Sequence, residues 1–163
     1  GENTSLVSAA LVDADGVPTD HYEPGTPIRL RVVLETSGLR GMSLELILRD
    51  EHNMPIAFYS TGVFNQVPLP GKPGRYECSL TLAPYWLASG DYCFDFITSN
   101  TYIGPDHRVD NALRFAVERC SPDAIPFNFS QGKGTGALAM RLAGPVEFTE
   151  LPPAGQEPKP GPG

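Results

Sequence analysis

The feature that most constrains this chain is the alternation of apolar and polar residues in short runs separated by turn residues. The runs at 30–35, 44–49 and 76–82 alternate with period 2, or nearly so. This period is typical of a strand that buries one face and exposes the other. A helical period is almost absent. We therefore expect an all-β protein built as an antiparallel β-sandwich.

Seven strands are expected from these runs and from the turn residues between them. Gly and Pro, at 17 residues each, are abundant, as suits a protein rich in turns. The expected strands are residues 5–13, 28–36, 42–50, 54–61, 75–82, 91–99 and 111–118. Residues 100–110 are expected to form a polar, irregular loop.

The C-terminal part of the chain has a different character. Residues 121–136 are rich in Pro, Phe and Gly and indicate a linker or a long excursion. A late strand, continuous or broken, is expected within 137–149. Residues 151–163 are rich in Pro and Gly and are expected to form a flexible tail after one sandwich domain, residues 1–150. Because an excursion before a final strand lets that strand pair with a second copy, we hypothesise a homodimer with an exchanged C-terminal strand.

Charge and cysteine usage narrow the classes of function. The net charge of -7 argues against binding of nucleic acid or an anionic membrane, but it is compatible with a small anion held by local arginines. Cys78, Cys93 and Cys120 form an odd set without metal-ligand spacing, which predicts free thiols in a reducing compartment. No apolar stretch approaches the roughly 20 residues that cross a bilayer, and no secretion signal is recognisable. We expect a cytoplasmic location.

Catalytic, metal and cofactor sites find little support in the sequence. His21, His52 and His107 fall in three separate segments without the spacing of metal ligands. No Gly-x-Ser-x-Gly elbow occurs, and the glycines around Lys133 lack the spacing of a phosphate-binding loop. Asp13 and Asp15 flank a Gly turn and indicate a hairpin more than a calcium site. We expect a non-catalytic protein without metal or cofactor.

A family pattern of turns and strand starts runs through most of the chain. Its pieces are residues 10–16, 22–30, 44–50, 89–92 and 112–118. In their order and spacing they resemble the C-terminal domain of the ATPase subunit of bacterial O-antigen ABC exporters, the Wzt type. The resemblance covers about residues 5 to 148.

The resemblance implies a cytoplasmic immunoglobulin-like sandwich, often dimeric, that recognises the modified non-reducing end of a finished polysaccharide. That recognition licenses export, and the attached ATPase domain connects such a module to the transmembrane exporter subunit at the inner face of the inner membrane. The ATPase domain itself has no counterpart in these 163 residues.

A candidate ligand-binding surface follows from the immunoglobulin-like arrangement, in which the strands at 42–50, 54–61, 91–99 and 111–118 form one sheet. If Leu44, Leu46 and Leu48 face the core, their neighbours face outward. The candidate residues are Arg49, Tyr59, Asp95, Ile97, Ser99 and Arg114 on the outer face, and Asn100, Tyr102, His107 and Arg108 in the adjoining loop.

These residue types suit a sugar. The ring of Tyr59 can cover the C–H face of a pyranose, and Asp95, Ser99 and Arg114 can bond its hydroxyl groups. Arg49 and Arg114 together could bind a carboxylate or phosphate through paired, charge-assisted hydrogen bonds. The pair of arginines favours an acidic cap on the sugar, although another modification is compatible.

Three other interpretations remain open. The same face could contact a protein, in which case the domain is a non-catalytic immunoglobulin-like interaction module. The domain could belong to a secreted carbohydrate-active enzyme. Exposed Arg, Asp and Ser are also ordinary on a solvated sheet, and the late strand could cover Ile47 and Ile97.

Overall fold

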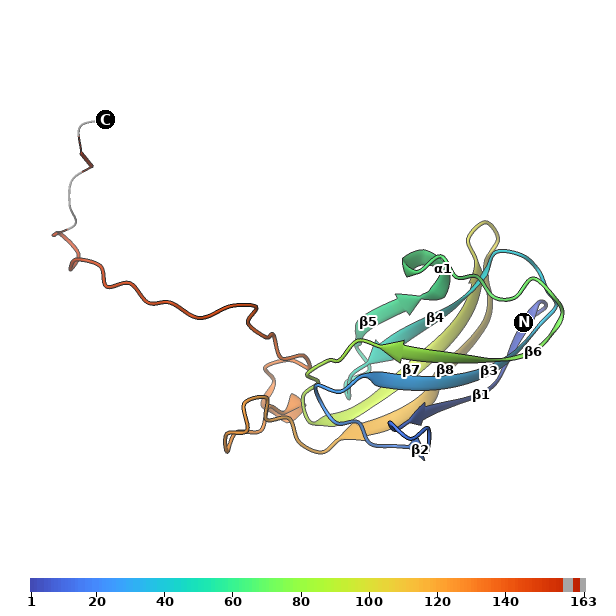
Figure 1. Ribbon diagram of the computed structural model, residues 1–163, viewed down its shortest axis with the longest axis horizontal. Coiled ribbons are helices and arrows are strands. Elements are labelled where there is room, and N and C mark those ends of the chain that lie inside the picture. Colours follow the sequence, from blue (N-terminus) through green and yellow to red (C-terminus); the bar gives the residue numbers. More distant parts are fainter. Residues whose placement is uncertain (157–159, 162–163) are drawn as a thin grey trace.

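Two four-stranded antiparallel sheets pack face to face in the computed structural model, which describes residues 1–156, 160 and 161 (Figure 1). The elements are β1 (Thr4–Val12), β2 (Pro18–Thr19), β3 (Ile28–Thr36), β4 (Met42–Arg49), β5 (Pro55–Ser60), α1 (Thr61–Phe64), β6 (Gly74–Leu82), β7 (Gly90–Asn100), β8 (Gly104–Val117) and the 3-10 turn η1 (Gln131–Lys133). One sheet has the order β2-β1-β3-β6 and the other β5-β4-β7-β8. The expected all-β sandwich is confirmed, and so is the expected composition of the second sheet.

The core lies between the sheets and follows the alternation in the sequence. Leu44, Leu46 and Leu48 of β4 are buried against Phe94 and Phe96 of β7. From the first sheet, the alternate residues of β3 point into the same layer; they are Ile28, Leu30, Val32 and Leu34. Burial of this apolar surface, worth about 25 cal/mol per Å², holds the two sheets together.

The two sides of the sandwich differ. Along β1 and β8 the sheets are joined by hydrogen bonds: the carboxylate of Asp106 accepts the backbone N–H groups of Asn3 and Thr4, and the N–H of Tyr22 donates to the carbonyl of Ala116. Along β5 and β6 the sheets stay apart. An apolar groove of about 330 Å³ lies there, with Leu46 and Phe94 of the core in its wall.

The expected loop at 100–110 is wrong, because most of it belongs to a hairpin. Only three residues separate β7 from β8, and β8 begins at Gly104. The side chain of Asn100 is buried, accepts the N–H of Tyr102 and donates to the carbonyl of Arg40, which fixes the turn. Residues 104–110 are polar because the outer side of this strand faces water. Their low apolar content gave no period-2 alternation from which the strand could be predicted.

The expected late strand is also wrong. Within 137–149 no strand is formed; Leu138 makes an isolated bridge to Leu87, and the backbone of Ala139 donates one hydrogen bond to Trp86. Residues 121–136 are not a free linker, because they fold back onto the sandwich and bury Gln131. A single bridge without neighbours cannot propagate into a ladder.

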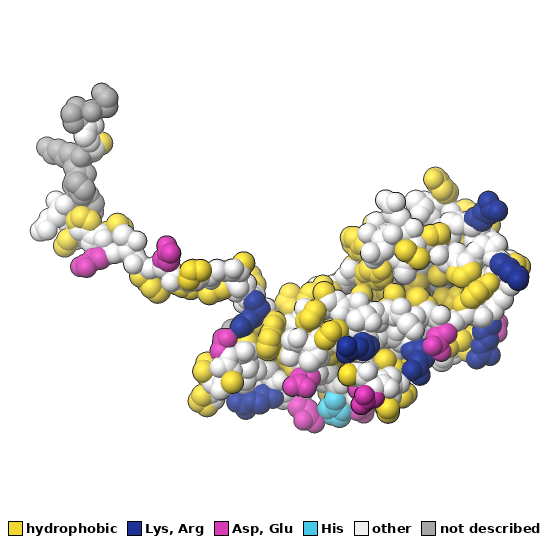
Figure 2. Space-filling view, viewed as in Figure 1, with side chains coloured by type: hydrophobic (Ala, Val, Ile, Leu, Met, Phe, Trp, Pro, Cys, Tyr) yellow, Lys and Arg dark blue, Asp and Glu magenta, His cyan; other side chains and the backbone are white. Residues whose placement is uncertain are grey.

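The segment that follows stands away from the body (Figure 2). All described residues from 142 onward are exposed. The domain boundary at residue 150 stays a prediction. The expected flexible tail, 151–163, includes residues 157–159, 162 and 163, which lie outside the described residues.

Candidate functional site

The outer face of the β5-β4-β7-β8 sheet carries a charged group, here called the Asp95 cluster: Arg49, Asp95, Arg108 and Asp110. Asp95 is 1% exposed and accepts hydrogen bonds from the Nε of Arg49 at 2.7 Å and from a terminal nitrogen of Arg108 at 3.2 Å. Its second oxygen accepts the backbone N–H of Asn111 at 2.8 Å. Arg108 also binds Asp110 at 2.6 Å. Every charge in the cluster therefore has a partner inside the protein.

The pKa of Asp95 follows from these contacts. Burial acts to raise it, but the hydrogen bond from Asn111 and the two guanidinium groups outweigh burial, so that the pKa lies below its ordinary value. The Arg49 pKa is raised in turn, chiefly by its hydrogen bond to Asp95. Both shifts favour the charged forms of Asp95 and Arg49.

A local backbone feature makes the cluster possible. Between Phe94 and Phe96 the β7–β8 ladder shifts its register, and Asn111 adopts a φ of 51°. Asn tolerates this left-handed conformation better than most residues. The irregularity aims the N–H of Asn111 at Asp95 instead of at a ladder carbonyl.

Next to the cluster, at the end of the sheet where β7 begins and β8 ends, lies a hollow of about 600 Å³, here called the face groove. Its lining residues are Asp20, His21, Asp50, Glu51, Asn53, Asp91, Tyr92, Cys93, Asn111, Arg114, Phe115 and Ala116. Arg114 is exposed and has no hydrogen-bond or ion-pair partner among the described residues. Beside it the thiol of Cys93 donates to the side-chain oxygen of Asn111.

The end of the face groove is built by a close approach around Gly90. This glycine has a φ of 142°, and a Cβ there would lie 2.6 Å from both the Nε2 of Gln131 and a carboxylate oxygen of Glu51. Gln131 accepts the N–H of Glu51 and donates to the carbonyl of Asp91. The excursion after β8 thereby fixes the backbone at Glu51 and Asp91, which line this part of the groove.

The structure distributes the ten expected site residues over several places. Arg49, Asp95 and Arg108 meet in the Asp95 cluster, and Arg114 lines the face groove. The backbone of β7 brings Ile97 to the outer face, yet it is only 6% exposed. Ser99 is half-buried at a register shift of the β7–β8 ladder.

The remaining expected residues serve other purposes. Asn100 holds the hairpin turn, and Tyr102 is almost fully exposed at its tip. His107 lies on β8 and its Nδ1 is 2.9 Å from the amino group of Gly1. None of these three lines the face groove.

Tyr59 was expected on the outer face, and this is wrong. It pairs with Leu46 of β4 and packs against the core, while Phe58 is exposed on the outer face. The register of the β4–β5 ladder shifts between Leu48 and Arg49, where β5 begins at Pro55. That shift changes the phase of β5 by one residue and exchanges its two faces.

The groove residues that sequence reasoning missed are acidic or amide side chains: Asp20, Asp50, Glu51, Asn53 and Asp91 at strand ends or in turns, and Asn111 within β8. Their signal was weak because Asp and Asn at such positions also mark ordinary turns. Asp50 lines the groove and also holds a turn, since its carboxylate accepts the N–H groups of His52 and Met54.

The part of the chain that the structure describes contains no group of three or more His, Cys, Asp or Glu placed to hold a metal ion. It also contains no helix long and apolar enough to cross a membrane. All three cysteines are free thiols, as expected.

Comparison with known proteins gives one informative result. No family model and no curated protein matches the sequence. Among solved structures, the crystal structure of the C-terminal domain of Wzt matches with a TM-score of 0.66 and 12% sequence identity, over 91% of this chain and 84% of that chain. The expected likeness to the Wzt C-terminal domain is confirmed at the level of the fold.

Proposed function

We propose that this domain binds the modified non-reducing end of a bacterial O-antigen polysaccharide in the face groove. In the cytoplasm, at the inner face of the inner membrane, this binding gates export by an ABC transporter. The observation that carries the proposal is the combination of an unpartnered Arg114 with an open groove on a sandwich that has the fold of the Wzt C-terminal domain. The domain contributes binding and no catalysis.

The chemistry of the groove suits sugar hydroxyl groups. Arg114 offers several N–H donors, and the carboxylates of Asp50, Glu51 and Asp91 are acceptors in the same lining. Tyr92 and Phe115 also line the groove, and their rings stack 5.4 Å apart in the core beneath the sheet. Pockets of 300–1,000 Å³ commonly hold small ligands, and this one has room for a terminal sugar with its cap.

The charge of the groove limits the cap. Arg49 donates its Nε to Asp95 and a terminal nitrogen to the carbonyl of Asn53, so it is committed to the protein. Arg114 is then the cation available to an acid, and four carboxylates surround the same space. We therefore favour a neutral modification of the terminal sugar, with an acidic cap limited to a group that Arg114 alone can neutralise.

Isothermal titration against an array of O-antigen oligosaccharides with intact and with removed caps tests this proposal. Arg114→Ala is expected to weaken binding of the capped fragment about tenfold, the loss of one charged hydrogen bond. Arg75→Ala is the matched control, because Arg75 is exposed on β6 in the other sheet. Equal affinities for capped and uncapped fragments, or an unchanged Arg114→Ala variant, would contradict the proposal.

The proposed partners are a second copy of this domain and the transmembrane exporter subunit, reached through an ATPase domain. A homodimer with exchanged C-terminal segments is supported by exposed apolar side chains in the C-terminal segment of the chain. Five large ones are exposed to solvent: Met140, Leu142, Val146, Phe148 and Leu151. The apolar groove between β5 and β6 is the proposed receiving surface on the second copy. Deleting residues 143–163 is then expected to halve the mass in light scattering, and a monomeric full chain would rule out the exchange.

The alternative function is a protein-interaction module. It is favoured by a patch of exposed apolar side chains away from the face groove: Phe58 of β5, which also lines the apolar groove, with Val63 and Phe64 of α1. Phe58 and Phe64 contact each other edge to face. If no capped oligosaccharide binds, while Phe64→Ser abolishes pull-down of the exporter's other subunits, this alternative replaces the first.

A further inference from the structure

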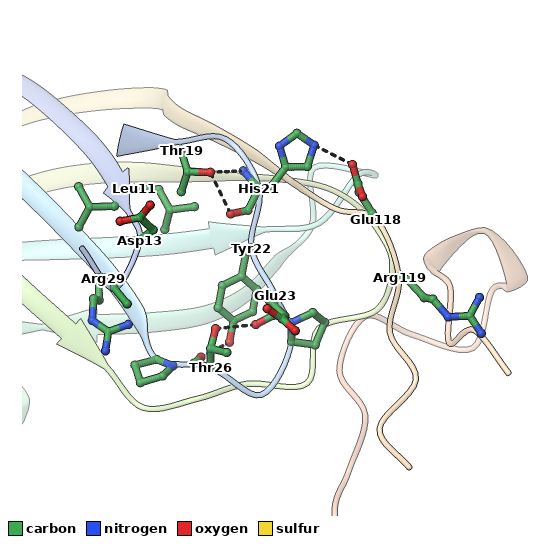
Figure 3. Close-up of a pocket in the computed structure, with 14 residues that line it drawn as sticks. Leu11, Asp13, Thr19, His21, Tyr22, Glu23, Thr26, Arg29, Glu118 and Arg119 are labelled. Atoms are coloured by element: carbon green, nitrogen blue, oxygen red, sulfur yellow. Dashed lines mark hydrogen bonds and ion pairs between the residues drawn. The ribbon is translucent and has the colours of Figure 1, made fainter. Parts of the chain in front are cut away.

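A second hollow lies adjacent to the face groove, at the end of the sandwich where β1 meets the turn before β3 (Figure 3). It has a volume of about 640 Å³ and is here called the end pocket. Its lining residues are Leu11, Val12, Asp13, Ala14, Thr19, His21, Tyr22, Glu23, Pro24, Thr26, Pro27, Arg29, Glu118 and Arg119. None of the residues that the sequence singled out for binding lies among them.

The walls of the end pocket combine apolar surface with free polar groups. Leu11 and Tyr22 are buried beneath it, and Pro24 and Pro27 border it. Among the described residues, the side chains of Glu23, Arg29 and Arg119 have no hydrogen-bond or ion-pair partner. Figure 3 shows Asp13 and Arg29 at one side and His21 with Glu118 at the other.

His21 connects the end pocket to the face groove, because it lines both. Its ring is held on both sides: Nδ1 lies 2.6 Å from a carboxylate oxygen of Asp20 and Nε2 lies 3.1 Å from one of Glu118. Asp20 lines the face groove and Glu118 lines the end pocket. The two hollows therefore share one fixed wall, and a chain molecule that passes over it contacts both.

We infer that the end pocket binds the internal sugar units of the same polysaccharide whose terminal unit lies in the face groove. This inference rests on the proposed function and adds a second subsite with its own residues. The ligand class is a chain of largely uncharged hexoses with free hydroxyl groups. Arg29 donates to these hydroxyls and Glu23 accepts from them, and the surfaces of Pro24 and Pro27 cover C–H faces of the rings.

The charge balance of the pocket favours this ligand over charged polymers. Two arginines, Arg29 and Arg119, stand against three carboxylates, those of Asp13, Glu23 and Glu118. Neither a polyanion nor a basic peptide would find a uniform field there, whereas hydroxyl groups bond to either sign. The open, shared wall suits an extended chain more than a compact metabolite.

A chain-length series tests the inference. Oligosaccharides of one to six units that keep their non-reducing end are titrated into the wild-type domain and into Arg29→Ala, Glu23→Gln and the control Arg75→Ala. We expect the wild type to gain about tenfold in affinity between one and four units. Arg29→Ala and Glu23→Gln should lose that gain while they bind the single terminal unit as the wild type does.

The outcomes separate the two proposals. If affinity depends on Arg114 but not on chain length, the end pocket is not a subsite, although the proposed function stands. If no fragment of any length binds, the proposed function falls and the inference falls with it. Backbone amide NMR shifts provide a second readout: those of Thr19 and Arg29 should move only with the longer fragments, and shifts that already appear with the single unit would also overturn the subsite.

Discussion

Two neighbouring regions of one sheet face contain the same kinds of side chain and have opposite properties. In the Asp95 cluster, arginines and carboxylates satisfy each other, and the central carboxylate is 1% exposed. In the face groove, Arg114 stands beside four carboxylates without a partner among the described residues. The first region keeps its charges paired inside the protein, whereas the second leaves an arginine available to the proposed ligand. A structural charge therefore differs from a candidate ligand contact in having a hydrogen-bond or ion-pair partner inside the protein, and not in its residue type.

Asp95→Ala should give the largest effect and break the cluster. Without the carboxylate, Arg49 and the N–H of Asn111 lose their partner in a partly buried place, and we expect a loss of about 3 kcal/mol in the free energy of unfolding. Urea denaturation followed by far-UV circular dichroism measures it. A loss below about 1 kcal/mol would mean that water replaces the carboxylate without cost.

Acid should weaken the cluster in the wild type. The folded-state pKa of Asp95 is lowered, as is that of Asp106, where burial acts upward but the hydrogen bonds of Thr4 and Asn3 outweigh it. Such groups contribute their full stability above the unfolded pKa, about 3.9, and lose it as the pH falls through the folded pKa. Urea midpoints measured from pH 6 down to pH 2 should therefore drop below about pH 4. The drop should be shallower in Asp95→Asn, and an equally steep one would exclude Asp95 as a cause.

Arg108→Ala should have a smaller effect than Asp95→Ala. Its side chain is 44% exposed, and its pairs with Asp95 and Asp110 lie at the edge of the cluster. Exposed pairs contribute about 0–1 kcal/mol, so the free energy of unfolding should fall by less than about 1 kcal/mol. The same urea titration checks it, and a larger loss would show that Arg108 is as essential to Asp95 as Arg49.

Arg114→Ala should leave stability unchanged within about 0.5 kcal/mol, because the side chain has no hydrogen-bond or ion-pair partner among the described residues. Thermal unfolding compared with that of Arg75→Ala measures the difference. A clear destabilisation would place Arg114 with the Asp95 cluster and remove the main argument for the face groove as a binding site.

The sequence predicted the sheets well and the site only in part. Period-2 alternation placed β1, β3, β4, β6 and β7 within a residue or two of their bounds. It failed at 100–110, where one solvent-facing strand carries few apolar residues, and at 137–149, where an apolar run has no strand to pair with. It also reversed the faces of β5, because a register shift is invisible in the spacing of residues.

Among the site residues, the sequence placed Arg114 outward and Asp95 on the correct side of β7, but it could not assign their partners. Asp95 meets Arg49 from β4 and Arg108 from β8, which lie 46 and 13 residues away along the chain. The face groove likewise depends on the approach of Gln131 to Glu51, across 80 residues.

The sequence by itself determined the fold class, the core layer and the solvent-facing side of most strands, since alternation is a local property that each strand carries in its own residues. Only the tertiary structure decided which charges neutralise each other and which stay open to a ligand. Those pairings depend on cross-strand register, on the irregularity at Asn111 and on a folded-back excursion, and all three join residues that are distant along the chain.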